Sequence, residues 1–227
     1  MTVKKLIAIV TIIVILSLNC EATLQDEFEV KYIKEETYYD TFINVEKQVE
    51  YFEKIYNTWS RFFAVIKDKL SVEDTKNYNA FLSAILALRE QYNNLSKFTY
   101  GEWRMLATTT DYEAHGCGLE HKEYVCQVVL NRCKDERFND NIYDNLIRPN
   151  QYNTIYVNPY YSDIRAKDHP ELWEESLLAA KNAMMGKVDM PENVIFQSNY
   201  SNLGKGHWKI IEVDTGWFKS TTYFSYG

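Results

Sequence analysis

Apolar residues form a regular helical stripe between Tyr38 and Leu70. They recur at steps of three and four along this stretch, with Glu and Lys side chains between them, and this spacing is typical of an amphipathic helix. A second stripe with the same spacing runs from Tyr78 to Leu95, and Ser71 followed by Asp74 is a typical helix start. Because a short turn joins the two stripes, we predict an antiparallel α-helical hairpin over residues 23–99. Its aromatic-rich face favours a bundle over a two-stranded coiled coil.

The pattern changes near residue 100, and short helices and strands follow. We predict helices over residues 102–114, 119–134, 141–147 and 170–186, which glycine or proline residues delimit. Three short strands are then predicted over residues 193–198, 207–213 and 221–226. Helices first and a small antiparallel sheet last define an α+β domain over residues 100–227. The hairpin before it is either a spacer for this domain or a wall-binding or dimerising module.

Residues 1–22 have the pattern of an export signal. Lys4 and Lys5 precede an apolar run from Leu6 to Leu18, which is short for a membrane span of about 20 residues. Cleavage after Ala22, lipidation of Cys20 and retention as a membrane anchor are all open from the sequence. We therefore expect an exported protein of the cell envelope or the extracellular space, either free or membrane-associated.

The charge limits the possible partners, and the cysteine spacing limits the possible disulfides. The formal net charge is −7 and no segment carries a basic stripe, so nucleic acid is not expected as a partner. Cys126 and Cys133 lie seven residues apart on a predicted helix, which separates their backbones by about 10 Å and rules out a disulfide between them. We expect both to be small core residues.

The run from Tyr112 to Arg132, YEAHGCGLEHKEYVCQVVLNR, resembles the signature of the spore-cortex-lytic, SleB-type cell wall hydrolase family. That family shows a Glu-Ala-x-Gly element and then a helix that ends in Val-(Val/Ile)-Leu-Asn-Arg. The resemblance extends over about residues 101–227 through a set of later positions, namely Phe138, Gln151, Tyr152, Phe196, Gln197, Gly206, Tyr223 and Phe224.

The resemblance implies a lysozyme-like fold and cleavage of peptidoglycan glycan strands between N-acetylmuramic acid and N-acetylglucosamine. It also implies one catalytic glutamate, which is Glu113 in this sequence. A carboxyl at a helix end against aromatic residues has a raised pKa, so it can donate a proton near neutral pH. We expect Asn131 and Arg132 to brace the site, and the candidate substrate contacts are His115, Gln151, Tyr152, Gln197 and Tyr223.

The sequence departs from the family at the position of a second acid. Cys117 stands where many members carry a second Glu, although Glu120 matches a common acidic position. Hydrolysis usually needs a second carboxylate, whereas a lytic transglycosylase uses the 6-hydroxyl of muramic acid as nucleophile. The sequence therefore favours a lytic transglycosylase, with a hydrolytic muramidase as the alternative.

Other functions receive less support from the sequence. A zinc amidase would need clustered ligands, but the four histidines are scattered and form no His-Glu-x-x-His motif. We therefore expect neither a metal nor a cofactor. A peptidase built on Cys117 and His207, and a wall-binding protein without catalytic activity, remain as alternatives. The expected partner is the peptidoglycan glycan strand, and the sequence does not predict an oligomeric state.

Overall fold

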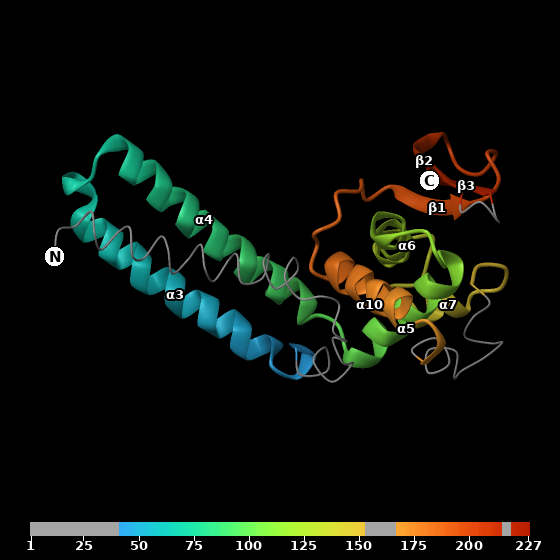
Figure 1. The fold of residues 1–227 in the computed structure, drawn as a ribbon, viewed down its shortest axis with the longest axis horizontal. Coiled ribbons are helices and arrows are strands. Elements are labelled where there is room, and N and C mark those ends of the chain that lie inside the picture. The colour runs from blue at the N-terminus through green and yellow to red at the C-terminus, as the bar shows by residue number, and fades with distance from the viewer. Residues whose placement is uncertain (1–40, 153–166, 215–218) are drawn as a thin grey trace.

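The computed structural model describes residues 41–152, 167–214 and 219–227. Two long helices come first, α3 (Val45–Ile66) and α4 (Val72–Leu95), and a 3-10 turn, η1 (Lys67–Lys69), connects them. The two helices lie side by side, run in opposite directions and project from the rest of the molecule (Figure 1). As predicted, the Ser71 side chain caps α4 by accepting a hydrogen bond from the backbone N–H of Asp74.

Aromatic side chains form most of the contact between α3 and α4. The rings of Phe63 and Tyr78 stack with centroids 4.5 Å apart, and Trp59 meets Phe81 edge-on at 5.8 Å. Tyr78 also donates a hydrogen bond from its hydroxyl to the Trp59 carbonyl at 2.7 Å, and its burial raises its pKa to about 12. Most of the other residues in the α3 stripe are only half-buried.

Four further helices follow, and three of them surround the fourth, α6. They are α5 (Tyr100–Glu113), α6 (Leu119–Arg132), α7 (Ile142–Ile147) and α10 (Pro170–Met184). Helix α6 is buried along most of its length, because α10, α5 and α7 pack on it and the first strand of the sheet covers another side. This central position explains why polar residues of α6, such as Lys122 and Asn131, are buried with its apolar ones.

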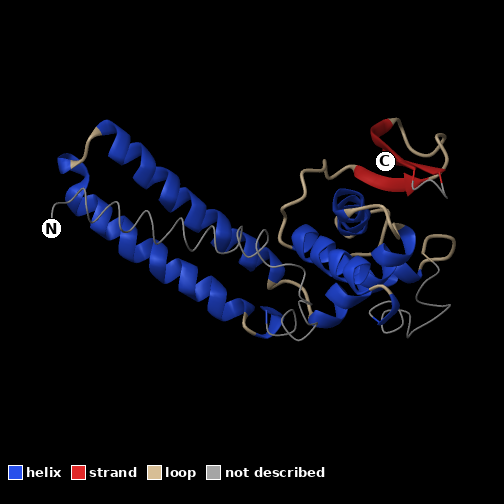
Figure 2. Cartoon of the chain, in the orientation of Figure 1, coloured by secondary structure: helices blue, strands red, loops and turns tan. Residues whose placement is uncertain are grey.

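The three strands lie at one end of the molecule (Figure 2). They are β1 (Val194–Ser198), β2 (His207–Asp214) and β3 (Lys219–Tyr226), and they form an antiparallel sheet in the order β1-β3-β2. Phe224 of β3 is fully buried against His121 and Tyr124 of α6, so one face of the sheet packs on this helix. The described residues therefore form a mixed α+β structure with seven helices, one of them a 3-10 helix, and a small antiparallel sheet.

The base of the α3–α4 pair shares its core with the helices that follow. Phe42 lies 5.2 Å from Trp103 between ring centroids, and Tyr92 and Leu95 belong to the same buried cluster as Trp103 and Leu106. The change of pattern near residue 100 therefore marks a change in architecture, while the hydrophobic core continues across it.

Several element ends differ from the sequence prediction. Helix α3 ends at Ile66 and tightens into a 3-10 turn, so Leu70, the last residue of the predicted stripe, is extended; residues 38–40 lie outside the described residues. Helix α6 ends at Arg132 instead of 134, and α10 ends at Met184 instead of 186. Strand β3 begins two residues earlier than predicted, because Lys219 and Ser220 still pair with Asp214 and Val213 of β2.

The cysteine prediction is confirmed for Cys126 and Cys133, which form no disulfide; the first is fully buried and the second packs against the same core. No helix in the described ranges is long and apolar enough to cross a membrane. The predicted export signal of residues 1–22 lies outside these ranges.

Candidate active site

Glu113 is the last residue of α5, and the first turn of this helix is fixed by a capping box. The Thr99 hydroxyl accepts a hydrogen bond from the backbone N–H of Glu102 at 3.2 Å, and the Glu102 carboxylate accepts one from the backbone N–H of Thr99 at 2.8 Å. Trp103, one residue further on, is fully buried and donates from its indole nitrogen to the Leu177 carbonyl of α10 at 3.0 Å. These contacts fix the position of the helix that ends at Glu113.

The chain turns sharply after Glu113. Ala114 is fully buried, and its N–H still donates to the Thr110 carbonyl at 2.9 Å. Gly116 and Gly118 then adopt positive φ angles of 74° and 75°, which a residue with a side chain rarely adopts, and lead the chain into α6. Glu113 is thereby followed by a buried alanine and a tight glycine turn.

The Glu113 carboxyl is accessible to solvent, although many protein atoms lie around it. Its side chain is exposed, yet desolvation by the protein around it raises its pKa to about 6. In the part of the chain that the structure describes, no hydrogen bond or ion pair holds this carboxyl. Desolvation thus shifts the pKa of Glu113 in the direction expected from the sequence.

Tyr152 lies within electrostatic reach of Glu113 and contacts Arg132. Tyr152 is 2% exposed, and its pKa is raised mainly by burial; Arg132 lowers it and the charge of Glu113 raises it. Arg132 contacts the Tyr152 hydroxyl from Nη1 at 3.4 Å, and its guanidinium carbon lies 5.5 Å from the centre of the Tyr152 ring. Two of the residues singled out in the sequence, Glu113 and Tyr152, are therefore brought together with Arg132.

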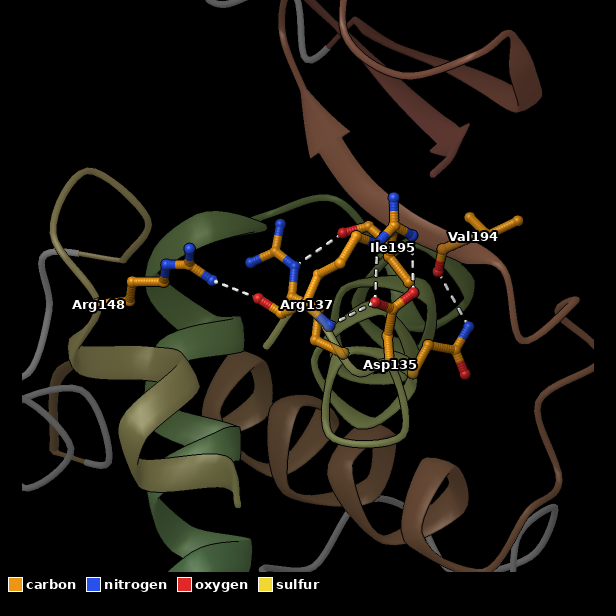
Figure 3. Close-up of polar contacts among 7 residues, drawn as sticks. Asp135, Arg137, Arg148, Val194 and Ile195 are labelled. Carbon is orange, nitrogen blue, oxygen red and sulfur yellow. Dashed lines mark hydrogen bonds and ion pairs between the residues drawn. The ribbon is translucent and has the colours of Figure 1, made fainter. Parts of the chain in front are cut away.

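Asn131 and Arg132 tie the end of α6 to the chain entering β1. The Asn131 amide donates to the carbonyls of Pro191 and Val194, both at 2.9 Å, and the Arg132 Nε donates to the Ile195 carbonyl at 2.7 Å. Figure 3 shows Val194 and Ile195 where these bonds reach the strand. The expected bracing role of these two residues is confirmed.

His115 lies two residues after Glu113, on the same turn. Its Nδ1 is 3.8 Å from an oxygen of the buried Asp111, which also accepts a hydrogen bond from the Ser176 hydroxyl at 3.1 Å. The His115 ring meets the His169 ring edge-on with centroids 5.5 Å apart. His115 is exposed, and this position beside Glu113 suits a substrate contact.

The other three candidate contacts lie in different surroundings. Gln151 is exposed on the turn that leads to Tyr152, while Gln197 is half-buried on β1, with a side-chain oxygen that has no hydrogen-bond partner among the described residues. The Tyr223 ring lies against the His207 ring with centroids 4.8 Å apart, and because Tyr223 alternates with the inward-facing Phe224, it lies on the sheet face opposite α6. The described contacts do not bring Gln197 or Tyr223 together with Glu113.

Glu120, the candidate second acid, takes part in polar contacts that connect α6 with β2. Its carboxylate pairs with Lys209 at 2.5 Å and accepts a hydrogen bond from the Tyr124 hydroxyl at 2.6 Å. The hydrogen bond from Lys209, and then that from Tyr124, lower the pKa of Glu120. An acid held in its charged form by a lysine is poorly suited to take up a proton from water.

Cys117 and His207, the pair required for a cysteine peptidase, make separate contacts. The Cys117 thiol lies 3.7 Å from the His115 carbonyl, whereas His207 hydrogen-bonds the Ser225 hydroxyl at 2.9 Å. Burial raises the pKa of Cys117, with opposing contributions from Lys122, which lowers it, and Glu175, which raises it. A catalytic thiol needs a lowered pKa, so this environment argues against the peptidase.

Histidines and acids do not form a metal-binding group within the described ranges. His121, for example, is 4% exposed, packs edge-on against Phe224 and has its pKa lowered to about 4 by burial. It is thus a neutral core residue beneath the sheet.

One further side chain, Arg148, lies near Arg132 and was not predicted from the sequence. Its guanidinium lies over the ring of Phe138 at 4.9 Å from the centroid, and Arg132 lies over the same ring at 5.3 Å. The signal available in the sequence is the Arg-Pro-Asn-Gln run at 148–151, which is typical of a tight turn that fixes its first residue.

Comparison with known proteins gives no assignment: no family model, curated protein or solved structure matches this chain.

Proposed function

We propose that this chain cleaves the glycan strands of peptidoglycan, with Glu113 as the general acid and base. The observation that carries the proposal is the raised pKa of Glu113, about 6, at the end of a firmly anchored helix. Glycosidic cleavage needs a carboxylic acid that still holds its proton near neutral pH, and at pH 7 about one-tenth of such a group is protonated. The bond expected to break joins N-acetylmuramic acid to N-acetylglucosamine.

The proposed reaction uses Glu113 twice. The protonated carboxyl first donates its proton to the glycosidic oxygen, so the bond to C1 of muramic acid breaks and positive charge develops on that sugar. The 6-hydroxyl of the same sugar then attacks C1, and the Glu113 carboxylate takes up the hydroxyl proton. The products are a 1,6-anhydro-muramic end and a new N-acetylglucosamine end, and the enzyme regains its protonated acid.

The state of the neighbouring acids supports a lytic transglycosylase over a hydrolytic muramidase. Glu120 is paired with Lys209 and Tyr124, and Asp111 is buried against Ser176 two residues before Glu113. Residues two apart on a helix face different directions, so Asp111 is directed away from Glu113. An intramolecular nucleophile would remove the need for a second carboxylate to activate water.

The proposal extends to the architecture and the location of the protein. We take the part from residue 100 onward as a lysozyme-like catalytic domain, consistent with its α+β structure. We take α3 and α4 as a helical hairpin that acts as a spacer between this domain and the cell envelope, after export directed by residues 1–22. The alternatives are a zinc amidase, against which the lack of a metal-binding group in the described ranges argues, and a wall-binding protein without activity.

The test is the change Glu113→Gln, assayed on purified peptidoglycan. The amide keeps the shape of the side chain but has no proton to donate, so cleavage should fall by about 10²–10⁴-fold. Glu136→Gln, which alters an exposed acid in a loop, is the matched control and should keep full activity. Mass spectrometry of the products should detect 1,6-anhydro-muramic ends.

Each outcome of this test has a defined meaning. Reducing muramic ends in place of anhydro ends would establish the muramidase alternative. Release of free peptide stems from intact glycan, lost on addition of a chelator, would establish the amidase. Full activity in the Glu113→Gln protein would refute the proposed role of this residue, and the absence of cleavage by the unmodified chain would leave the wall-binding protein.

A further inference from the structure

The exposed Arg148 side chain is held in a fixed orientation at the start of the turn that leads to Tyr152. Its guanidinium stacks on the Phe138 ring, and its Nη1 donates to the backbone carbonyl of Arg137 at 3.4 Å (Figure 3). The side chain is exposed, so most of its N–H groups face solvent. Since a guanidinium has five N–H donors in a planar fork, a group fixed in this way can still bind a planar anion through two of them.

A tight turn fixes Arg148 relative to Tyr152. The backbone N–H of Gln151 donates to the Arg148 carbonyl at 3.2 Å, Pro149 occupies the second position, and Asn150 has a φ of 63° at the third. This combination is typical of a type II turn, in which the third residue must adopt a positive φ. The turn ends directly before the buried Tyr152. The exposed Arg148 and the buried Tyr152 are therefore joined by one tight turn.

The charge of Arg148 is not neutralised by neighbours in the described structure, unlike that of Arg137. Arg137 forms a two-bond pair with Asp135, at 2.8 Å and 2.7 Å. For Arg148 no carboxylate lies within ion-pair distance in residues 41–152, 167–214 and 219–227, and its polar contact there is the Arg137 carbonyl. Arg148 can therefore accept an external anion, whereas Arg137 already holds an internal one.

Pairwise interactions relate Arg148 to Glu113. Both Arg148 and Arg132 lie over the Phe138 ring, Arg132 contacts the Tyr152 hydroxyl, and the charge of Glu113 contributes to the raised pKa of Tyr152. Arg148 is thus an exposed, unneutralised guanidinium beside the residues that surround Tyr152. The sugars of peptidoglycan carry hydroxyl and acetamide groups, and its carboxylates lie on the peptide stem attached to muramic acid.

We propose that Arg148, held over Phe138, binds a carboxylate of that peptide stem and so selects glycan strands whose stems keep this carboxylate free. This inference rests on the proposed function, since it names the substrate feature that the Glu113 site would recognise. The chemistry is a bidentate guanidinium–carboxylate pair, whose geometry the stacking and the turn fix in advance. Arg148 is thus assigned to substrate selection, and the proton transfers remain with Glu113.

The experiment compares two soluble glycan fragments of equal length that both carry peptide stems, one with free stem carboxylates and one with these carboxylates converted chemically to amides. Stems are kept in both fragments because their removal would free the lactyl carboxylate of muramic acid. Binding is measured by titration calorimetry on the full chain carrying Glu113→Gln, which prevents turnover. The fragment with free carboxylates should bind about 10-fold more tightly, as expected for a hydrogen-bonded pair with a charged group. Adding Arg148→Gln should abolish this difference and leave the affinity for the amidated fragment unchanged.

Arg137→Gln is the matched control, because it removes a neighbouring arginine whose charge Asp135 already neutralises. This variant should keep the 10-fold preference, and circular dichroism should show that both variants are folded. Equal binding of the two fragments, or a preference that survives Arg148→Gln, would overturn the inference while the proposed function stands. Failure of both fragments to bind the Glu113→Gln protein would overturn both.

Discussion

The helical pair α3–α4 and the part that follows residue 100 are stabilised by different kinds of contact. The pair is held by ring contacts between half-buried residues, such as Trp59 with Phe81. In the second part, buried polar side chains connect the elements. Lys122, for example, is fully buried in α6, donates to the Leu172 carbonyl at 2.8 Å and pairs with Glu175 of α10 at 2.9 Å.

The two kinds of contact differ in how precisely they fix the geometry that each region needs. Ring contacts stabilise through buried area and tolerate small shifts, whereas buried hydrogen bonds are directional and costly to leave unmade. The ends of α5 and α6, where Glu113 and Arg132 lie, must keep a fixed geometry if they are to act on one bond of a substrate. The α3–α4 pair needs only length and stiffness to serve as a spacer.

The largest expected effect comes from comparing one tryptophan in each region. Trp103→Ala should reduce the free energy of unfolding by about 4 kcal/mol, because it opens a cavity in the shared core and removes the bond to the Leu177 carbonyl. Trp59→Ala should cost only about 1.5 kcal/mol, because that ring is half-exposed. Urea denaturation followed by circular dichroism measures both, and equal losses would show that the two regions are packed alike.

The second comparison uses one lysine in each region. Lys122→Met should cost about 3 kcal/mol, since it leaves Glu175 without its cation in a largely buried position. Lys54→Met in α3 removes a pair with Glu50 at 3.7 Å whose side chains are 78% and 70% exposed, so its effect should stay within about 0.5 kcal/mol. The same denaturation experiment decides, and a Lys122→Met protein as stable as the unmodified chain would contradict the structural role of this ion pair.

The sequence predicted the existence and type of every helix and strand after residue 40 that the structure describes at length, because periodicity and caps are local signals. Leu119 opens α6, Pro170 opens α10 and Ser71 caps α4 as expected. Helix ends were less accurate, since the last turn is decided by competing backbone bonds. At Lys67–Lys69, such bonds replace the α-helix by a 3-10 turn.

Tertiary contacts account for what the sequence did not predict. A lysine on a helix is ordinarily assigned to solvent, and Lys122 is buried because α10, 50 residues away along the chain, covers it. The shared core at residue 100 and the stacking of Arg148 on Phe138 are likewise contacts between segments that local patterns do not connect. Of the candidate site, Glu113 and Tyr152 lie within electrostatic reach of each other, whereas the described contacts leave Gln197 and Tyr223 elsewhere.

The smallest expected effect concerns Glu113, whose desolvation is not compensated by a hydrogen bond among the described residues. Burial raises its pKa from the ordinary carboxyl value of 4.5 to about 6 in the folded protein, so the folded state binds more protons between these values. Stability should therefore fall as the pH rises from about 4.5 to about 6, and the loss should be complete above that range. The side chain is exposed, and solvent screening limits the effect to about 1 kcal/mol.

Glu113→Gln, which stays neutral, should consequently be more stable than the unmodified chain by about 1 kcal/mol near pH 7.5 and equal to it near pH 4. Urea denaturation of both proteins at the two pH values gives this difference, and other titrating groups cancel because both proteins contain them. Glu136→Gln should show no difference at either pH, since that acid is exposed in a loop. If Glu113→Gln were no more stable near pH 7.5, the carboxyl would be as well solvated in the folded chain as in the unfolded one. Glu113 would then have an ordinary carboxyl pKa and would not hold its proton near neutral pH.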